Sequence, residues 1–365
     1  MKKSLIALAV AGTFIAPVAM AETTIYGAAN VSFDIVNSGS GGATANQVSS
    51  NASAIGFKGS EDLGGGTYAI WQIESNVNLD NSSNGAAGGV ALGGNDSFAG
   101  LSGKEWGTVL LGQHDTPYKM ATRGLDLFPD TAADNRNLTG PLDGSNTQHV
   151  GSLVAYISPA MSGVTVAAAY GAVAEIPKSG ATKGSAYSLA AMYGAGPLNA
   201  AFAYQTVTIG SAGTGTAGSD VVFGSANDKL TAWTLAGGYT MDALLVNASY
   251  EKRKYEVNGG VSVDQNDWYL AGKYRIGNDA VKLAYTSAGD FSGAGNNDTG
   301  ASQVAVGYDH SLSKNTTVYA LYTQVSNKKK AQYGMGGYDG ITAMVGAAKL
   351  DSDPSVWSLG LKHSF

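Results

Sequence analysis

The last nine residues, 357–365 (WSLGLKHSF), alternate between apolar and polar side chains and end on an aromatic residue. Successive side chains of a β-strand point to opposite faces, so the odd-numbered residues from Trp357 to Phe365 share one largely apolar face. The even-numbered residues share a small, polar face. Most chain ends fray into water. A hydrophobic final residue in so regular a pattern therefore indicates that this end is built into a sheet.

The same alternation recurs along the chain, in 23–35, 53–60, 267–277 and 281–285. In these segments Lys58, Lys273, Arg275 and Lys282 fall on the face opposite the apolar residues. Charges on the inner face of several strands would be costly in the dry core of a soluble sandwich, but they are favourable in a water-filled lumen. After residue 21 no apolar run approaches the roughly 18 residues of a helical membrane span. A membrane location would therefore require a closed β-barrel.

The sequence predicts an all-β fold, a transmembrane antiparallel β-barrel of 16 strands. The predicted strands are 24–36, 51–60, 67–79, 96–103, 107–115, 147–158, 164–173, 184–194, 198–208, 229–241, 243–255, 263–276, 280–288, 301–311, 316–325 and 354–365. Tight turns and long loops alternate between them, and an even strand count brings both ends of a barrel to one side. The segments 316–325 and 150–158 can be assigned to either face.

Residues 1–21 have the order of a cleaved secretory signal peptide: Lys2 and Lys3, an apolar run, and Ala19-Met20-Ala21. The alternative is a membrane anchor, but the apolar run is shorter than the roughly 20 residues that span a bilayer. Residues 22–365 are predicted to form one barrel domain. Loss of two lysines leaves 20 basic and 28 acidic residues, a formal charge of −8, which argues against nucleic acid as a partner. There is no cysteine.

The chain resembles the general diffusion porins of Gram-negative bacteria, in particular the neisserial and betaproteobacterial trimeric group. The resemblance lies in IYGAANVSFD, GFKGSEDLGGGTYAIWQIE, LSGKEWGTVLLGQHDTP, VAYISPAMSGV, VGYDHSLSKNTTVYALY and the terminal GLKHSF. It implies a homotrimer in the outer membrane, an inward-folded third loop, and passive passage of ions and small hydrophilic solutes without a cofactor.

The candidate for that loop is residues 116–148, which are too many for a simple connection. They carry Lys119, Arg123 and Arg136 beside Asp126, Asp130, Asp134 and Asp143. If the loop folds inward, these charges sit at the narrowest part of the pore and select ions. The alternative is a surface loop with solvated charges.

The pore wall facing this loop is expected to carry Lys58, Gln113 and His149. Ala54, Gln113 and His149 stand where several members of the family carry arginine. With few wall cations and four loop aspartates, we expect weak selectivity with a preference for cations.

Other partners are expected at the surface. The resemblance implies that Phe365 is the signal read by the outer-membrane assembly machinery; an aromatic girdle residue is the alternative. Lys328, Lys329 and Lys330 could contact lipopolysaccharide phosphates or form a solvated loop tip.

Enzymatic function is not indicated, because His114-Asp115 lacks an accompanying nucleophile motif such as Gly-x-Ser-x-Gly. A substrate-specific channel or a surface adhesin on the same barrel scaffold stays an alternative.

Overall fold

The computed structural model describes residues 22–39, 44–80, 92–140, 149–172, 184–210, 227–257, 260, 262–293, 296–336 and 349–365. The predicted signal peptide, 1–21, lies outside these residues. Among the described residues no helix is long and apolar enough to cross a membrane.

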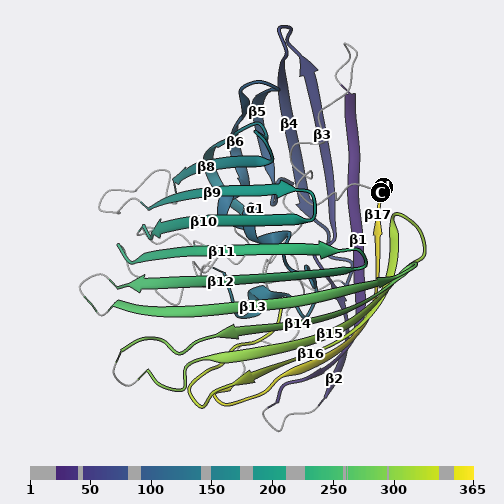
Figure 1. Ribbon diagram of the computed structural model, residues 1–365, viewed down its shortest axis with the longest axis vertical. Helices are drawn as coiled ribbons and strands as arrows, with labels where there is room; N and C mark the ends of the chain where they lie inside the picture. The colour runs from purple at the N-terminus through teal and green to yellow at the C-terminus, as the bar shows by residue number, and fades with distance from the viewer. Residues whose placement is uncertain are drawn as a thin grey trace.

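The described strands form one antiparallel sheet that closes on itself (Figure 1). Apart from β2 and β3, which both pair with β1, each strand pairs with its neighbours in the chain, as expected for an up-and-down barrel. The strands are β1 (Glu22–Asn37), β2 (Ala45–Ser50), β3 (Ala54–Asp62), β4 (Thr67–Asn76), β5 (Ser97–Gly103), β6 (Gly107–Asp115), β7 (His149–Ile157), β8 (Val164–Ala172), β9 (Ser185–Ala195), β10 (Leu198–Thr208), β11 (Lys229–Met241), β12 (Leu244–Glu256), β13 (Ser262–Ile276), β14 (Asp279–Ala288), β15 (Ala301–Ser311), β16 (Thr316–Asn327) and β17 (Ser355–Ser364).

The barrel has 16 strands because β2 and β3 occupy one strand position. Both pair with β1, β2 along Val31–Val36 and β3 along Glu22–Ala28. Between them Ala52 has a φ of 54°, which interrupts the ladder. The prediction of one strand at 51–60 was wrong at this point, because it missed β2 and placed Asn51 to Ser53 inside a strand. The remaining predicted strands are confirmed to within a few residues.

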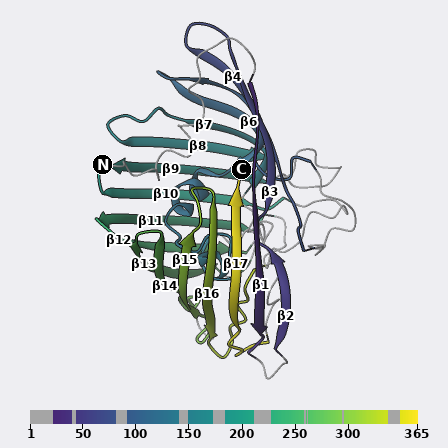
Figure 2. The ribbon, with the colours of Figure 1, turned by 90° about the vertical axis from the view of Figure 1, so that its right-hand side faces the viewer.

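The last strand closes the barrel against the first. β17 pairs with β1 from Ala28 opposite Ser364 to Asn37 opposite Ser355, and the two lie side by side in Figure 2. The predicted alternation of faces in β17 is confirmed: Trp357 and Leu359 are 60% and 65% exposed, whereas Ser358 between them is buried. On β1, Phe33 and Ile35 are exposed while Asn30, Ser32 and Asp34 are buried. The apolar face therefore points outward, toward lipid in a membrane.

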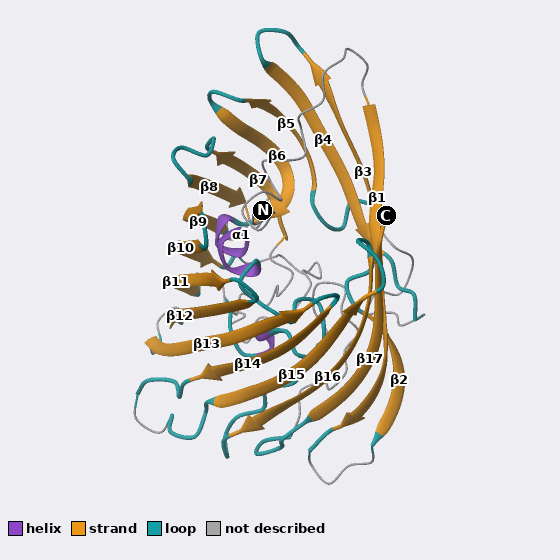
Figure 3. Ribbon diagram, turned by 45° about the vertical axis from the view of Figure 1, so that its right-hand side comes forward, coloured by secondary structure: helices purple, strands orange, loops and turns teal. Residues whose placement is uncertain are grey.

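One barrel rim has short connections and the other has long ones. Residues 63–66, 104–106, 196–197, 242–243, 277–278 and 312–315 are tight turns, whereas the connections that follow β4, β6, β10 and β16 are long. This asymmetry is typical of outer-membrane barrels. The connections at this second rim begin with the ones after β1, β4 and β6, so the connection after β6, 116–148, is the third; it carries the helix α1 (Pro117–Arg123) and the short 3-10 helix η1 (Asn135–Asn137). Both lie on the concave, inner side of the sheet (Figure 3). We call this connection loop 3.

Candidate pore constriction

The helix at the start of loop 3 is specified by its end residues. Thr116 is its N-cap, with Oγ1 accepting a hydrogen bond from the Lys119 amide at 3.3 Å, and Pro117 occupies the first turn, where no intrahelical donor is lost. Arg123 in the last turn complements the helix dipole, and Gly124 ends the helix. A short, capped helix can hold its side chains in fixed directions inside the lumen.

Small residues on the barrel wall make room for this helix. Tyr118 and Ala121 pack against alanines on the inner faces of β9, β10 and β11, namely Ala190, Ala201, Ala203 and Ala232. These alanines are nearly fully buried. Larger side chains there would displace the helix toward the pore axis, because a packed interface has little room to adjust.

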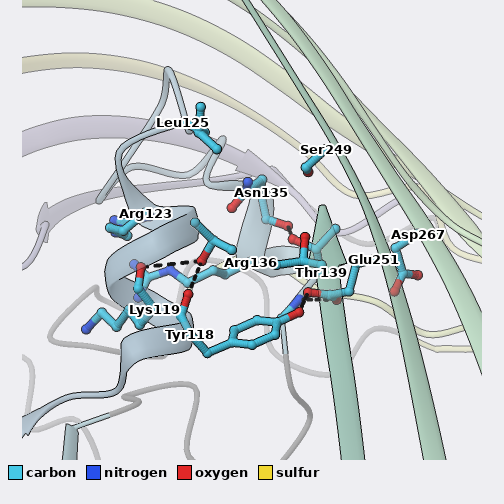
Figure 4. Close-up of a pocket in the computed structure, with 13 residues that line it drawn as sticks. Tyr118, Lys119, Arg123, Leu125, Asn135, Arg136, Thr139, Ser249, Glu251 and Asp267 are labelled. Carbon is cyan, nitrogen blue, oxygen red and sulfur yellow. Dashed lines mark hydrogen bonds between the residues drawn. The ribbon is translucent and has the colours of Figure 1, made fainter. Parts of the chain in front are cut away.

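Hydrogen bonds from the wall fix the helix in place. The Tyr118 amide donates to Ser188 Oγ at 3.0 Å, and the Tyr118 hydroxyl donates to Glu251 of β12. Figure 4 shows the Tyr118 ring directed from the helix toward Glu251. A cavity of about 30 Å³ remains beside it, lined by Arg136, Thr139 and Glu251 among others. This is space for only about one water molecule, so the loop sits closely on the wall.

Arg253 of β12 holds the far end of the described loop. Its guanidinium is fully buried and donates to the carbonyls of Leu138 at 2.9 Å and Gly140 at 3.0 Å. It also pairs with Asp267 of β13 at 2.6 Å. Glu251 accepts from the Gly140 amide at 2.8 Å. A buried arginine needs such complete pairing, so these contacts are costly to break singly.

The middle of the loop crosses the lumen. Asn247 of β12 donates to the Leu125 carbonyl at 2.7 Å, and the Tyr269 hydroxyl of β13 donates to Asp126 at 3.0 Å. On the opposite side Asn30 of β1 donates to the Asp130 carbonyl at 3.2 Å. Loop 3 thus contacts wall strands on both sides of the barrel.

An apolar cluster supports this crossing. Phe128, Leu127 and Leu138 of loop 3 are buried against inner alanines of β13, β14 and β15. Gly307 lies directly beneath the Phe128 ring, where an added Cβ would come within 2.6 Å of Phe128 Cε1. The Lys282 ammonium lies 4.6 Å from the same ring and pairs with Asp309 at 2.8 Å. Loop 3 therefore rests on both packing and polar contacts.

Five of the predicted loop charges come together in one cluster. Arg123 pairs with Asp130, with Asp134 at 2.9 Å and with Asp126 at 3.6 Å. Arg136 pairs with Asp134 at 2.9 Å and with Asp130 at 3.4 Å. Two arginines and three aspartates give the cluster a formal charge of −1. Lys119, another of the seven predicted loop charges, lies apart and pairs with Asp115 at 2.8 Å.

The aspartates of this cluster also order the loop backbone. Asp126 accepts from the amides of Phe128 and Asn135, and Asp134 accepts from the amides of Asp130 and Arg136. Such carboxylate-to-backbone bonds replace regular secondary structure in a loop. Of the cluster, Arg123 and Asp130 keep the most exposed side chains, 19% and 25%, and the other three are almost fully buried.

The cluster shifts two carboxyl pKa values in opposite directions. Burial, together with the neighbouring Asp134 charge, raises the pKa of Asp126 to about 6, although Arg123 opposes the shift. Burial would also raise the pKa of Asp134, but Arg123 and Arg136 outweigh it and hold that pKa below its ordinary value. Asp134 therefore stays ionised, while Asp126 can take up a proton near neutral pH.

The structure places the predicted wall residues in different surroundings. Lys58 lies on the inner face of β3, and its ammonium is 4.8 Å from the centre of the Tyr26 ring. Gln113 donates a hydrogen bond to the Gly94 carbonyl. The next residue, His114, is buried, and its ring packs edge-on against the ring of Phe98. His149 is the first residue of β7, paired with Asp115. Asp143 lies outside the described residues. The role of these residues in selectivity stays a prediction.

Phe365 extends the closing ladder. Its amide donates to the Gly27 carbonyl and its carbonyl accepts from the Gly27 amide, both at 3.0 Å. The ring lies over Gly27, where a built Cβ would be 2.7 Å from Cζ, and it is exposed on the outside.

Sequence reasoning missed the wall residues that hold loop 3. Asn247, Glu251 and Arg253 share the inner parity of β12, and Asp267 and Tyr269 share that of β13. The signal was present as polar residues at every second position. Without the fold, however, they are indistinguishable from side chains that line open water.

Comparison with known proteins identifies the family. The Gram-negative porin family matches residues 5–330. The chain belongs to this family. It is 28% identical over 335 residues to the major outer membrane protein P.IB of Neisseria gonorrhoeae, covering 87% of this chain and 91% of that protein. It is 27% identical over 385 residues to the outer membrane porin protein 32 of Delftia acidovorans, covering all of both. The solved anion-selective porin from Comamonas acidovorans superposes with a TM-score of 0.79 at 23% identity, covering 95% of this chain and 100% of that one.

The family and the closed barrel together establish the general function. The protein is an outer-membrane porin, a general diffusion channel through which ions and small hydrophilic solutes pass without turnover. Members of this family are channels rather than enzymes.

Proposed function

We propose that loop 3 forms the constriction of this channel and that its charged cluster filters solutes by size and charge. The observation that carries the proposal is the crossing of the lumen by residues 116–140, held by Glu251 and Arg253 on one side and contacted by Asn30 on the other. Arg123 and Asp130, the most exposed charges of the cluster, are the groups that passing ions meet first.

We propose weak selectivity with a preference for cations. Within the cluster the two arginines cancel two of three aspartates, which leaves one negative charge to act on ions in the narrow part of the pore. Lys58, Lys273 and Arg275 face the lumen without an ion pair in the described part of the chain and reduce this preference. The Comamonas porin is described as anion-selective, but at 23% identity its likeness supports the fold and not the charge pattern.

We also propose that three copies assemble as a homotrimer. The support is the resemblance to trimeric porins and a shallow apolar groove of about 600 Å³ on the outer wall. The groove crosses β1, β2, β16 and β17 and is lined by Val31, Phe33, Val48, Leu359 and Leu361 among others. Cross-linking in detergent, followed by denaturing gel electrophoresis, tests it; a protein that stays monomeric under all mild detergents contradicts it.

The surface contacts remain proposals of the same kind. Phe365, exposed at the end of β17, is proposed to be read by the assembly machinery before the barrel closes. Lys329 is exposed in the connection after β16, whereas Lys328 pairs with Asp290 at 2.9 Å. Contact with lipopolysaccharide phosphate is therefore proposed mainly for Lys329.

The reversal potential across a potassium chloride gradient in planar bilayers tests the selectivity. A small potential of the sign set by potassium is expected. A clear chloride preference contradicts the proposed selectivity, although it leaves the channel itself intact.

A further inference from the structure

The connection after β16 also enters the barrel. Residues 328–336 and 349–354 of this eighth long loop are described, and Ala331 and Met335 are 3% and 1% exposed. Such burial is unusual for a loop at the rim of a barrel, where side chains normally face water. We call residues 331–336 the loop-8 segment.

Asn327 at the end of β16 turns the chain inward. Its side chain accepts from the Tyr333 amide at 2.8 Å and donates to the Tyr333 carbonyl at 3.0 Å. It also donates to the Ser352 carbonyl at 2.6 Å, on the returning part of the loop. One buried amide thus clamps both arms of the loop and fixes where the loop-8 segment begins.

Tyr333 carries the segment across the inner wall. Its hydroxyl accepts from Gln265 Nε2 at 2.7 Å, and Gln265 lies on the inner face of β13. Because the segment leaves from the end of β16, it passes β15 and β14 to make this contact with β13. Gln265 is fully buried and also donates to the Gly289 carbonyl at 2.7 Å. Gln265 is therefore held in place by the wall and fixes the position of the Tyr333 hydroxyl.

The end of the segment contacts loop 3 itself. The Gly336 amide donates to Asn137 Oδ1 at 3.2 Å. Asn137 in turn donates to the Ala132 carbonyl at 2.8 Å and, more weakly, to Gln303 of β15 at 3.4 Å. Met335 belongs to the same buried apolar cluster as Phe128 and Leu138 of loop 3. The 3-10 helix of loop 3 is therefore held between the wall and the loop-8 segment.

We propose that the loop-8 segment is a positioning element of the pore, with Met335 and Tyr333 as the residues that hold loop 3 against β12 to β15. This inference rests on the constriction proposed above. The other contacts of loop 3 come from strands of the barrel wall, whereas the loop-8 segment adds contacts from a second loop, to Asn137 and to the apolar cluster of loop 3. Without it, the distal half of loop 3 would fluctuate in the lumen, and the open pore would become electrically noisier and close at lower voltage.

The test compares Met335→Ala and Tyr333→Phe with the parent channel in planar bilayers. Gln332→Ala is the matched control, since Gln332 lies between the two residues but is exposed. We expect both variants to show greater open-channel current noise and a lower closing voltage, with Met335→Ala the stronger, while Gln332→Ala matches the parent. Thermal unfolding of each purified variant separates an effect on loop 3 from a loss of the barrel.

Parent-like noise and closing voltage in Met335→Ala and Tyr333→Phe would overturn the inference. Arg123→Gln in the same experiments distinguishes a failure of the proposed constriction from a failure of the positioning role of the loop-8 segment. If Arg123→Gln changes selectivity while the Met335 and Tyr333 variants change nothing, the constriction stands and the positioning role is wrong. If neither loop affects the current, the proposed constriction fails with it.

Discussion

The Tyr118 hydroxyl of loop 3 donates a hydrogen bond to Glu251 on the inner wall of β12, so the helix α1 is tied to the barrel by a buried carboxyl group. Glu251 also accepts from the Gly140 amide, at the other end of the described loop. A single wall carboxylate therefore joins both ends of the loop segment that crosses the lumen.

Tyr118→Phe should loosen loop 3 without unfolding the barrel. It removes one hydrogen bond to a charged group, which contributes about 1.5–3 kcal/mol, and leaves the Glu251 carboxylate partly unpaired. We expect unchanged barrel unfolding but larger fluctuations of single-channel current. Tyr156→Phe, which removes a hydroxyl that donates to the Trp106 carbonyl in the 104–106 turn, is the control. Equal current traces for both variants would argue against the contact.

Arg123→Gln should increase the preference for cations. The change takes the formal charge of the loop cluster from −1 to −2 and removes its most exposed cation. For one charge about 8 Å from the ion path in water, about 0.5 kcal/mol or a roughly twofold change in the permeability ratio is expected. Reversal potentials measure it. Lys314→Gln, in the 312–315 turn, is the control and should leave the ratio unchanged; a shift toward chloride in Arg123→Gln would refute the assignment.

Selectivity should depend on pH through Asp126. Because burial raises its pKa to about 6, Asp126 takes up a proton as pH falls from 7.5 to 5, while Asp134 stays ionised. Arg123 and Asp134 in loop 3, and Tyr269 on β13, are the charged and titratable groups that face it. The cluster charge then changes from −1 to 0, and cation preference should fall.

The same shift has a consequence for stability. The folded loop binds this proton more tightly than the unfolded chain, so the contribution of protonated Asp126 to the free energy of unfolding is greatest at low pH and is lost as pH rises through about 6.

Asp126→Asn removes the titrating group and should flatten the pH dependence of the reversal potential near pH 6. A parent-like pH profile in this variant would assign the effect to another group.

Gly27→Ala should impair closure of the barrel. An added Cβ would lie 2.4 Å from the Ala54 carbonyl oxygen and 2.7 Å from the Phe365 ring, at the last step of the β1–β17 ladder. Gly272→Ala is the control, because its Cβ would meet only one atom, at 4.0 Å. Folding into detergent micelles, followed by the heat-dependent shift on gels, should be slower or incomplete for Gly27→Ala alone.

The mature protein should begin at Glu22. Intact mass measurement of the protein extracted from outer membranes gives the cleavage site directly. A mass that includes residues 1–21 would show that the predicted signal peptide is retained.

The sequence predicted most of the barrel because lipid outside and water inside impose a strict two-residue period. In β17, for example, Trp357 and Leu359 point outward and Ser358 between them points inward. β2 was missed because ANQVSS is polar at most positions and its pairing with Val31 to Val36 is a long-range property. The charged residues of loop 3 were recognised, but their pairing was not, since it depends on how residues 123–136 fold back on themselves. For the same reason the contacts from Glu251, Arg253 and Met335 could not be predicted.

A cysteine at Gly124 tests whether loop 3 lies in the ion path. The chain has no native cysteine, and Gly124 is exposed at the end of the loop 3 helix with a φ of −69° that any residue adopts. If loop 3 lies in the lumen, reaction of Gly124→Cys with a bulky thiol reagent should lower the single-channel conductance, and reduction should restore it. An unchanged conductance after complete labelling would place loop 3 outside the ion path and contradict the account.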